Sequence, residues 1–139
     1  MFNRILIANR GEIASRLVRA AHYVGAEAVA VYSEADENAP FVHQADQAIP
    51  IGPSPAAQSY LRADVILEAA RQSGAQAIHP GYGFLSENPG FAEACEKASI
   101  SWVGPPPEAM RAMADKVDAR NIVAKAGVPV VPGTDEPVT

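Results

Sequence analysis

The sequence predicts an α/β fold in which a parallel β-sheet carries helices on both faces. Two observations lead to this prediction. Short apolar segments alternate along the chain with longer segments whose apolar residues recur at helical spacing. The first short segment is apolar almost throughout, which is typical of a parallel strand that is buried on both faces. Repeated strand–helix units of this kind favour one open parallel sheet.

The predicted strands are residues 4–8, 28–33, 48–51, 76–79 and 101–104. A further apolar segment, residues 128–131, predicts one more strand. The predicted helices are residues 11–24, 40–45, 64–73, 89–98, 108–113 and 115–126. Gly25, Gly74 and Gly127 follow three of these helices and are suited to end them.

Two helices carry more detailed expectations. In the first, one face is predicted to be buried, and its residues are Ile13, Leu17, Ala20, Ala21 and Val24. In the helix that begins near Asp64, this aspartate is the predicted N-cap, because its side chain can accept a hydrogen bond from a free backbone N–H group.

Consecutive prolines at positions 105–107 divide the chain into two parts. We expect a main domain at residues 1–104 and connecting helices at residues 105–139. The last segment, residues 134–139, carries no stop signal. We therefore expect the architecture to continue beyond the chain.

Composition describes a globular core, with 48% hydrophobic and 19% charged residues among 139. The net charge of −5 and the absence of a basic run argue against nucleic-acid binding. No apolar run reaches the roughly 18 residues of a membrane helix. The single cysteine, Cys95, lies in a helical pattern and is interpreted as a core residue, which suits the cytoplasm.

The strongest site candidate is the segment Ile-His-Pro-Gly-Tyr-Gly-Phe-Leu-Ser-Glu-Asn at residues 78–88. Its glycines and proline constrain the backbone, and they follow directly on a predicted strand. His79, Gly81, Tyr82, Gly83 and Glu87 are the candidate ligand contacts. From the residues alone, a structural loop and a functional loop are equally favoured.

Other motifs are weaker. Residues 9–12, Asn-Arg-Gly-Glu, lie between a strand and a helix, where a structural turn is favoured over a ligand contact. Arg16, Arg19 and Tyr23 share a helical face, which is interpreted as solvated or as a protein interface. Lys116 is either a phosphate contact or an exposed lysine. Met110 and Met113 are interpreted as core, and no metal-ligand motif is present.

Several motifs together resemble the N-terminal part of biotin carboxylase, found in acyl-CoA carboxylases and pyruvate carboxylase. The matching segments are residues 7–14, 29–33, 59–61, 77–88, 103–105, 113–116 and 127–133. The resemblance covers essentially the whole chain. Its departures are Ala114, where the family usually has glycine, a loose match at residues 41–46, and Gln47 in place of an acidic residue.

The resemblance implies a Rossmann-like domain that precedes an ATP-grasp domain. It also implies an enzyme that uses ATP, Mg²⁺ (or Mn²⁺) and bicarbonate to carboxylate biotin on a carrier domain. Lys116 matches a lysine that contacts ATP, and Tyr82 matches a tyrosine near the biotin pocket. The loop that includes His79, Gly81, Gly83 and Glu87 lines the same cleft.

The implied partners are the biotin carboxyl carrier domain, a carboxyltransferase and a second copy of the enzyme, which Arg16, Arg19 and Tyr23 would contact. The catalytic and metal-binding residues of the family would lie beyond residue 139. We therefore expect an inactive N-terminal fragment of a cytoplasmic carboxylase. The alternatives are a separate nucleotide-binding module, a dimerisation domain, or another ATP-grasp enzyme such as carbamoyl-phosphate synthetase.

Overall fold

The computed structural model describes residues 1–131 and contains a five-stranded sheet with the order β3-β2-β1-β4-β5. Every pair of neighbouring strands is parallel. The strands are β1 (Arg4–Ile7), β2 (Glu27–Tyr32), β3 (Gln47–Pro50), β4 (Ala77–His79) and β5 (Ser101–Trp102). The predicted parallel sheet is confirmed, with bounds that differ by one or two residues.

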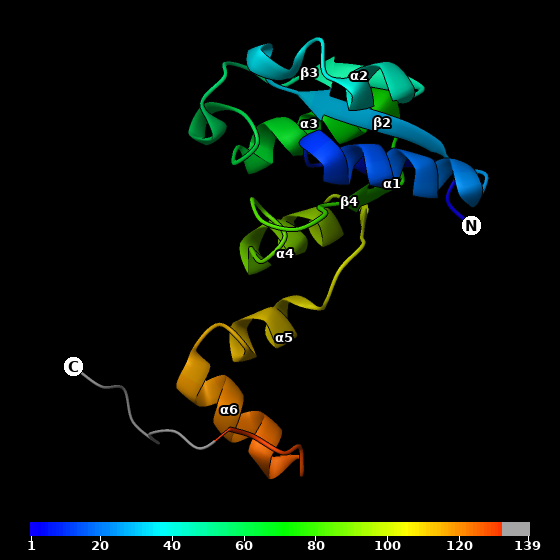
Figure 1. Cartoon of the computed structure of the whole chain (residues 1–139). Coiled ribbons are helices and arrows are strands. Elements are labelled where there is room, and N and C mark those ends of the chain that lie inside the picture. The colour runs from blue at the N-terminus through cyan, green and yellow to red at the C-terminus, as the bar shows by residue number, and fades with distance from the viewer. Residues whose placement is uncertain (132–139) are drawn as a thin grey trace.

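The helices are α1 (Gly11–Tyr23), α2 (Pro40–Gln44), α3 (Ala63–Ser73), α4 (Pro89–Lys97), α5 (Pro107–Ala112) and α6 (Lys116–Lys125). Two 3₁₀ turns, η1 (Glu34–Asp36) and η2 (Ala56–Gln58), lie in the loops after β2 and β3. The helices α1 and α2 cover one face of the sheet, and α3 and α4 cover the other (Figure 1). The predicted coverage of both faces is therefore confirmed.

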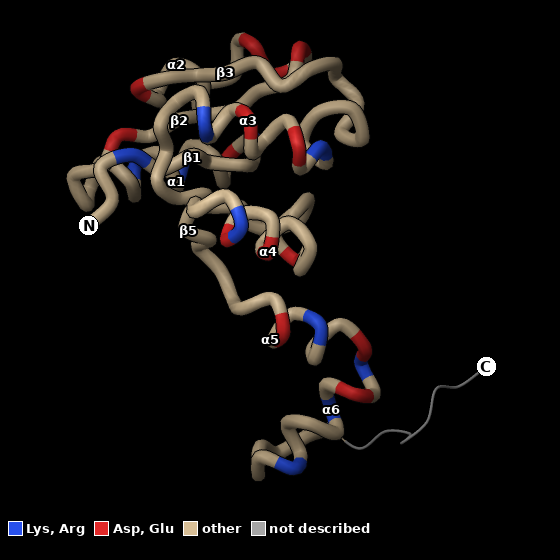
Figure 2. The backbone as a smooth tube through the Cα atoms, turned by 180° about the vertical axis from the view of Figure 1, so that it is seen from behind, with Lys and Arg blue, Asp and Glu red and all other residues tan. Residues whose placement is uncertain are grey.

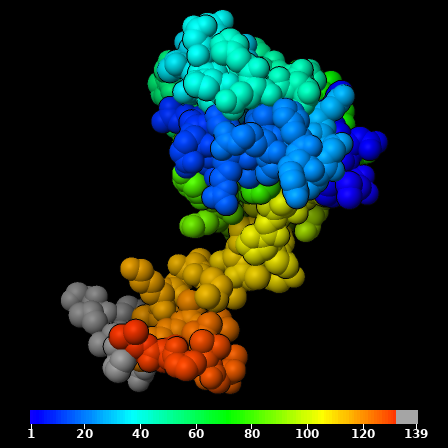
Figure 3. Space-filling model, turned by 45° about the vertical axis from the view of Figure 1, so that its right-hand side comes forward, coloured from blue at the N-terminus to red at the C-terminus, as the bar shows by residue number. Residues whose placement is uncertain are grey.

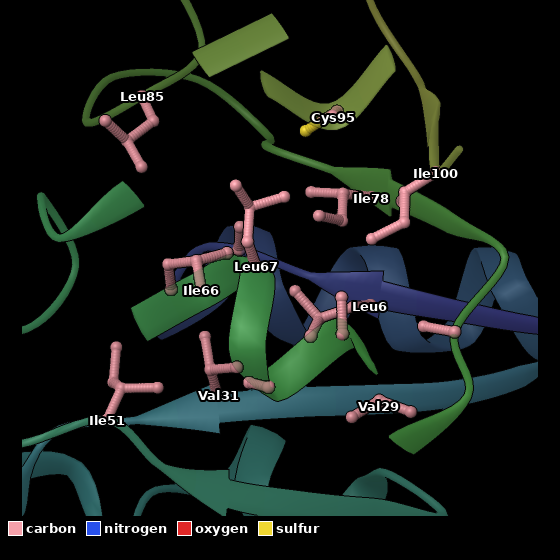
Figure 4. Packing of buried hydrophobic residues seen from close by; sticks show 14 of the residues in the cluster. Leu6, Val29, Val31, Ile51, Ile66, Leu67, Ile78, Leu85, Cys95 and Ile100 are labelled. Atoms are coloured by element: carbon pink, nitrogen blue, oxygen red, sulfur yellow. The ribbon is translucent and has the colours of Figure 1, made fainter. Parts of the chain in front are cut away.

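Two apolar clusters hold these layers together, one on each face of the sheet. On the α3–α4 face, side chains of the central strands pack against the helices, as Figure 4 shows for Leu6, Val31, Ile66 and Ile78. Each fully buried aliphatic side chain of this size contributes about 1.5–3 kcal/mol. Cys95 is fully buried in the same cluster, as expected of a core residue.

The buried face of α1 differs from the prediction. Its buried residues are Ile13, Ala14, Val18 and Ala21. Ala20 and Val24 are exposed, and Leu17 is only half-buried. Ala14 and Val18 pack in the apolar cluster on this face of the sheet, so the buried side of the helix is turned toward them.

Of the two predicted ends of α3, the C-terminal one is confirmed and the N-terminal one is wrong. Gly74 ends the helix in the left-handed conformation, at φ 68°, as predicted. Asp64 is not the N-cap, since Arg62 occupies that position and the helix has no side-chain cap. Asp64 instead forms an ion pair of 2.6 Å with Arg62.

Beyond β5, α5 and α6 extend away from the sheet and form a separate lobe in the space-filling view (Figures 1 and 3). Arg111 of α5 bonds Glu93 of α4 at 2.6 Å and anchors this lobe. No residue of α6 is buried. Residues 27–46 carry acidic residues and no lysine or arginine, whereas acidic and basic residues are mixed along α5 and α6 (Figure 2).

The strand predicted at residues 128–131 is absent, and this prediction is wrong for the described chain. These residues are exposed, and a strand requires a neighbour whose N–H and C=O groups it can bond. The predicted end segment, residues 134–139, lies outside the described residues. Across residues 1–131, no helix is both long and apolar enough to span a membrane.

Candidate functional site

The candidate site lies where the strand order reverses, between β1 and β4. The two strands are adjacent and parallel, so the loops that follow them leave the same edge of the sheet. The backbone N–H of Ala8 still bonds the carbonyl of His79, at 2.9 Å. In open α/β sheets, ligands bind in the crevice at this edge.

Asn9 connects the two loops. Its side chain is 3% exposed, and its amide nitrogen donates to the carbonyls of Pro80 and Tyr82, both at 2.7 Å. Its side-chain oxygen accepts the backbone N–H of Arg10 at 2.9 Å. The sequence favoured a structural turn here, and the structure adds that this turn fixes the candidate loop.

The backbone of the loop depends on its glycines. Gly81 and Gly83 adopt φ of +66° and +67°, which L side chains rarely adopt. A Cβ atom on Gly81 would lie 2.8 Å from the amide nitrogen of Asn9. A Cβ atom on Gly83 would meet nothing within 4 Å, so this side of the loop is open.

His79 stabilises the start of the loop. Its Nδ1 atom accepts the backbone N–H of Gly81 at 3.1 Å, so the neutral ring carries its proton on Nε2. Burial lowers the pKa of His79, which favours this neutral form. The geometry therefore gives His79 a structural contact within the loop.

Tyr82 projects from the loop with 60% of its surface exposed. Its hydroxyl donates to Glu12 in the first turn of α1, and this bond raises the pKa of Tyr82. Together with residues 9–11, 13, 83 and 84, these two residues line an open groove of about 420 Å³. Of the predicted loop contacts, Tyr82 and Gly83 line this groove.

Phe84 is held by residues from two other loops. It has a positive φ of 43°, which strains a residue with a side chain. Its ring stacks on Tyr60 with centroids 5.1 Å apart, and the Arg10 guanidinium lies 5.7 Å from both ring centroids. These contacts stabilise the strained conformation.

Tyr60 is itself fixed by hydrogen bonds at the end of β2. Its hydroxyl donates to Asp36 at 2.7 Å and accepts the backbone N–H of Ser33 at 3.1 Å. Arg10 approaches the same aspartate at 3.6 Å. No local pattern in the sequence indicates this role of Tyr60, because its partners lie 24 to 27 positions away.

Glu87 links the loop to the second lobe. It lines a groove of about 440 Å³ together with Pro105, Ala109, Met110, Met113 and Ala114. Lys116 follows two positions later, exposed at the first residue of α6. Lys116 is therefore close in sequence to the residues that line this groove, at the start of the next helix.

The methionine prediction is half correct, because Met110 is 9% exposed whereas Met113 is 52% exposed. The substitution at Ala114 strains nothing, since this residue does not have a positive φ. Asp115 caps α6 through its side chain, which accepts the backbone N–H groups of Val117 and Asp118 at 2.8 and 3.1 Å. This cap fixes the helix start at Lys116.

The predicted interface residues Arg16, Arg19 and Tyr23 are all exposed on α1. Tyr23 is 93% exposed, which is unusual for a large aromatic side chain. Within residues 1–131, no group of three His, Cys, Asp or Glu side chains is arranged to hold a metal ion. The candidate site can offer a ligand backbone groups, Tyr82, Glu12 and Glu87, and Lys116 is an exposed cation at the start of α6.

Comparison with known proteins places these features in a family. The family model described as "Biotin carboxylase, N-terminal domain" matches residues 1–110. The biotin carboxylase of Halalkalibacterium halodurans is 53% identical over 135 residues, which are 97% of this chain and 30% of that protein. The propionyl-CoA carboxylase alpha chain of Ruegeria pomeroyi is 54% identical over 133 residues, which are 96% of this chain and 20% of that protein. The chain thus spans under a third of the length of these relatives.

Solved structures agree with the sequence match. A biotin carboxylase complex with β-γ-ATP from Campylobacter jejuni superposes with a TM-score of 0.93 at 49% identity, covering 97% of this chain and 30% of that one. The biotin carboxylase domain dimer of Hydrogenobacter thermophilus 2-oxoglutarate carboxylase, with MgADP, ADP and bicarbonate, gives 0.91 at 46%, with the same coverage. The chain belongs to the biotin carboxylase N-terminal domain family.

Proposed function

We propose that this chain forms one wall of the active-site cleft of an ATP-dependent biotin carboxylase. The observation that carries the proposal is the β1–β4 crevice, in which Asn9 fixes the loop that presents Tyr82. The family and the crevice position support it together. The whole enzyme would be a ligase that forms a C–N bond in a biotin-dependent carboxylase.

The proposed reaction consists of a phosphoryl transfer to bicarbonate and a carboxyl transfer to biotin. A bicarbonate oxygen attacks the γ-phosphorus of ATP, and the bond to ADP breaks to give carboxyphosphate. Carboxyphosphate breaks down to phosphate and CO₂, the released phosphate takes the proton of the biotin ureido nitrogen, and this nitrogen attacks the CO₂ carbon. Catalysis of such steps depends on positioning and on stabilisation of negative charge.

The residues of this chain would position substrates rather than perform the chemistry. Tyr82 would border biotin, and the backbone of Gly81 and Gly83 would let the loop approach it closely. His79 would hold the loop start, and Glu87 would line the groove that it shares with Met110 and Met113. Each of these roles is a proposal that rests on the resemblance and on the loop geometry.

The described residues suit contact with ATP but do not supply a site for its metal ion. Lys116 is an exposed cation at a capped helix start, which suits contact with an ATP phosphate. ATP would supply the phosphoryl group and Mg²⁺ (or Mn²⁺) would offset its charge, but residues 1–131 contain no cluster for the metal. We propose that residues outside this chain hold the metal, and that residues 1–139 alone are inactive.

The test uses the protein expressed from its whole reading frame, with ATP, Mg²⁺, bicarbonate and free biotin. We expect ADP release that depends on bicarbonate and biotin, and carboxybiotin as product. Lys116→Ala should raise KM for ATP at least about tenfold, whereas Lys125→Ala at the other end of α6 should not. ADP release without carboxybiotin would refute the proposal, and activity of residues 1–139 alone would refute their inactivity.

We also propose a homodimer contacted through Arg16, Arg19 and Tyr23, with a carrier domain and a carboxyltransferase as further partners. The exposure of these α1 side chains supports the contact. Sedimentation should show a dimer that Arg19→Glu dissociates and Arg71→Glu, on α3, leaves intact. An unchanged mass for Arg19→Glu would remove this face from the interface.

We also propose a domain boundary at residue 104 and a cytoplasmic location. The division at residue 104 is supported by the separate lobe of α5 and α6 (Figure 3). A cytoplasmic location is supported only by the single, buried Cys95.

A further inference from the structure

We propose that Asn9 is a positioning residue that sets the peptide between Tyr82 and Gly83 for ligand binding. This inference rests on the proposed function, because it assigns biotin to the groove beside Tyr82. It deepens that function by adding a residue that the ligand itself need not touch.

The contacts of Asn9 leave it little freedom. Both protons of its amide are used, one on the carbonyl of Pro80 and one on that of Tyr82, each at 2.7 Å. Its oxygen is used by the N–H of Arg10. A side chain that is 3% exposed and bonded at both ends holds the loop without help from a ligand.

The direction of one N–H group follows from these bonds. In a planar trans peptide, the C=O and N–H groups point in opposite directions. Since the carbonyl of Tyr82 points at Asn9, the N–H of Gly83 points away from it. The equivalent N–H after Pro80, on Gly81, is already bonded to His79.

The N–H of Gly83 has no hydrogen-bond acceptor among residues 1–131. The space over Gly83 is open, and Gly83 lines the groove beside Tyr82. Asn9 therefore presents a fixed backbone donor to the groove, which suits a neutral acceptor such as a carbonyl oxygen. A donor that is fixed in advance costs less ordering on binding.

Substitution of Asn9 by aspartate tests this arrangement at constant volume. The introduced carboxylate can still accept the N–H of Arg10 but cannot donate to the two carbonyls, which it would repel. Asn3→Asp is the matched control, because it makes the same charge change at an exposed residue just before β1.

With the whole-frame protein and free biotin as probe, Asn9→Asp should raise KM for biotin about tenfold, with kcat changed less than about twofold. KM for ATP should stay unchanged, and Asn3→Asp should alter neither constant. Amide hydrogen exchange at residues 81–84 should accelerate in Asn9→Asp alone. An unchanged KM for biotin with unchanged exchange would overturn the proposal, as would an equal rise of both KM values.

Two outcomes call for a second measurement. If Asn9→Asp does not fold, Gly81→Ala serves instead, because its Cβ atom would lie 2.8 Å from the Asn9 amide nitrogen and displace it. A rise in KM for biotin without a rise in KM for ATP then supports the proposal, and an unchanged KM for biotin overturns it. If the wild type does not carboxylate biotin, the proposed function fails. Faster amide hydrogen exchange in Asn9→Asp, confined to residues 81–84, would then still support the positioning role of Asn9. Exchange as slow as in the wild type would refute it.

Discussion

The hydroxyl of Tyr82 donates a hydrogen bond to the carboxylate of Glu12, which precedes it by 70 positions. This bond joins the tip of the candidate loop to the first turn of α1. Arg16, one turn further along the same helix, is close enough to act on the phenol electrostatically. The proposed dimer face and the proposed biotin wall therefore share one helix.

This contact predicts how Tyr82 titrates. The hydrogen bond to Glu12 raises the pKa of Tyr82, because it favours the neutral phenol. In Glu12→Gln, the pKa of Tyr82 should fall toward its ordinary value, as measured by NMR of ¹³C-labelled tyrosine. Glu37→Gln, which removes an exposed carboxylate elsewhere, should leave it in place; an equal fall in both variants would contradict the contact.

Removal of the Tyr60 hydroxyl should destabilise the fold. Tyr60 is 1% exposed, and Tyr60→Phe leaves the buried N–H of Ser33 without its acceptor. We expect a loss of about 1–3 kcal/mol in urea unfolding. Tyr32→Phe, at a half-buried residue of β2, should cost less than Tyr60→Phe. Equal losses would mean that the hydroxyl bonds of Tyr60 are not what stabilises these loops.

Asp46 predicts a dependence of stability on acid. Its pKa is lowered from 3.8 by the backbone N–H of Ala28 and by His22, so the folded state favours the carboxylate. The stabilisation is present above the unfolded pKa and is lost as pH falls through the folded pKa.

Asp46→Asn should therefore unfold more easily at pH 7, by about 0.5 kcal/mol because solvent screens this 45% exposed side chain, and lose less stability on acidification than the wild type. Denaturant unfolding across the acid range measures both effects. The control is Glu34→Gln, an exposed carboxylate whose pH profile should match the wild type. A variant with the full acid dependence of the wild type would contradict the assignment.

The single tryptophan reports on the junction between the domain and the second lobe. Trp102 packs edge-on against Phe91 at 5.5 Å and donates to the carbonyl of Pro105 at 3.2 Å. A Cβ atom on Gly104 would lie 2.5 Å from the indole nitrogen.

Gly104→Ala should displace this indole, shift its fluorescence to the red and cost about 1–3 kcal/mol through overpacking. Gly90→Ala in α4 should leave the emission unchanged, because its Cβ would approach only Asn88, at 3.3 Å. An unshifted emission in Gly104→Ala would contradict the prediction, because it would mean that the environment of the Trp102 indole is unchanged.

The sequence predicted features that depend on neighbouring residues better than features that depend on contacts distant in the sequence. Gly74 was predicted because a left-handed helix end depends on a single residue. The buried face of α1 was predicted only in part: Ile13 and Ala21 are buried, but Ala14 is buried in place of Ala20, and these two alanines have the same hydropathy, so only the sheet distinguishes them. Residues 128–131 have the composition of a strand, but a strand also needs a partner.

By itself, the sequence determined the alternation of strands and helices, the parallel sheet and the position of the loop at residues 78–88. Local spacing and backbone restrictions are sufficient for these features. Only the tertiary structure decided that Asn9 bonds this loop, that Tyr60 and Arg10 stabilise Phe84, and that Tyr82 meets Glu12. Each of these contacts joins segments 24 or more positions apart, and the sheet brings those segments to one edge because all its strands run in the same direction.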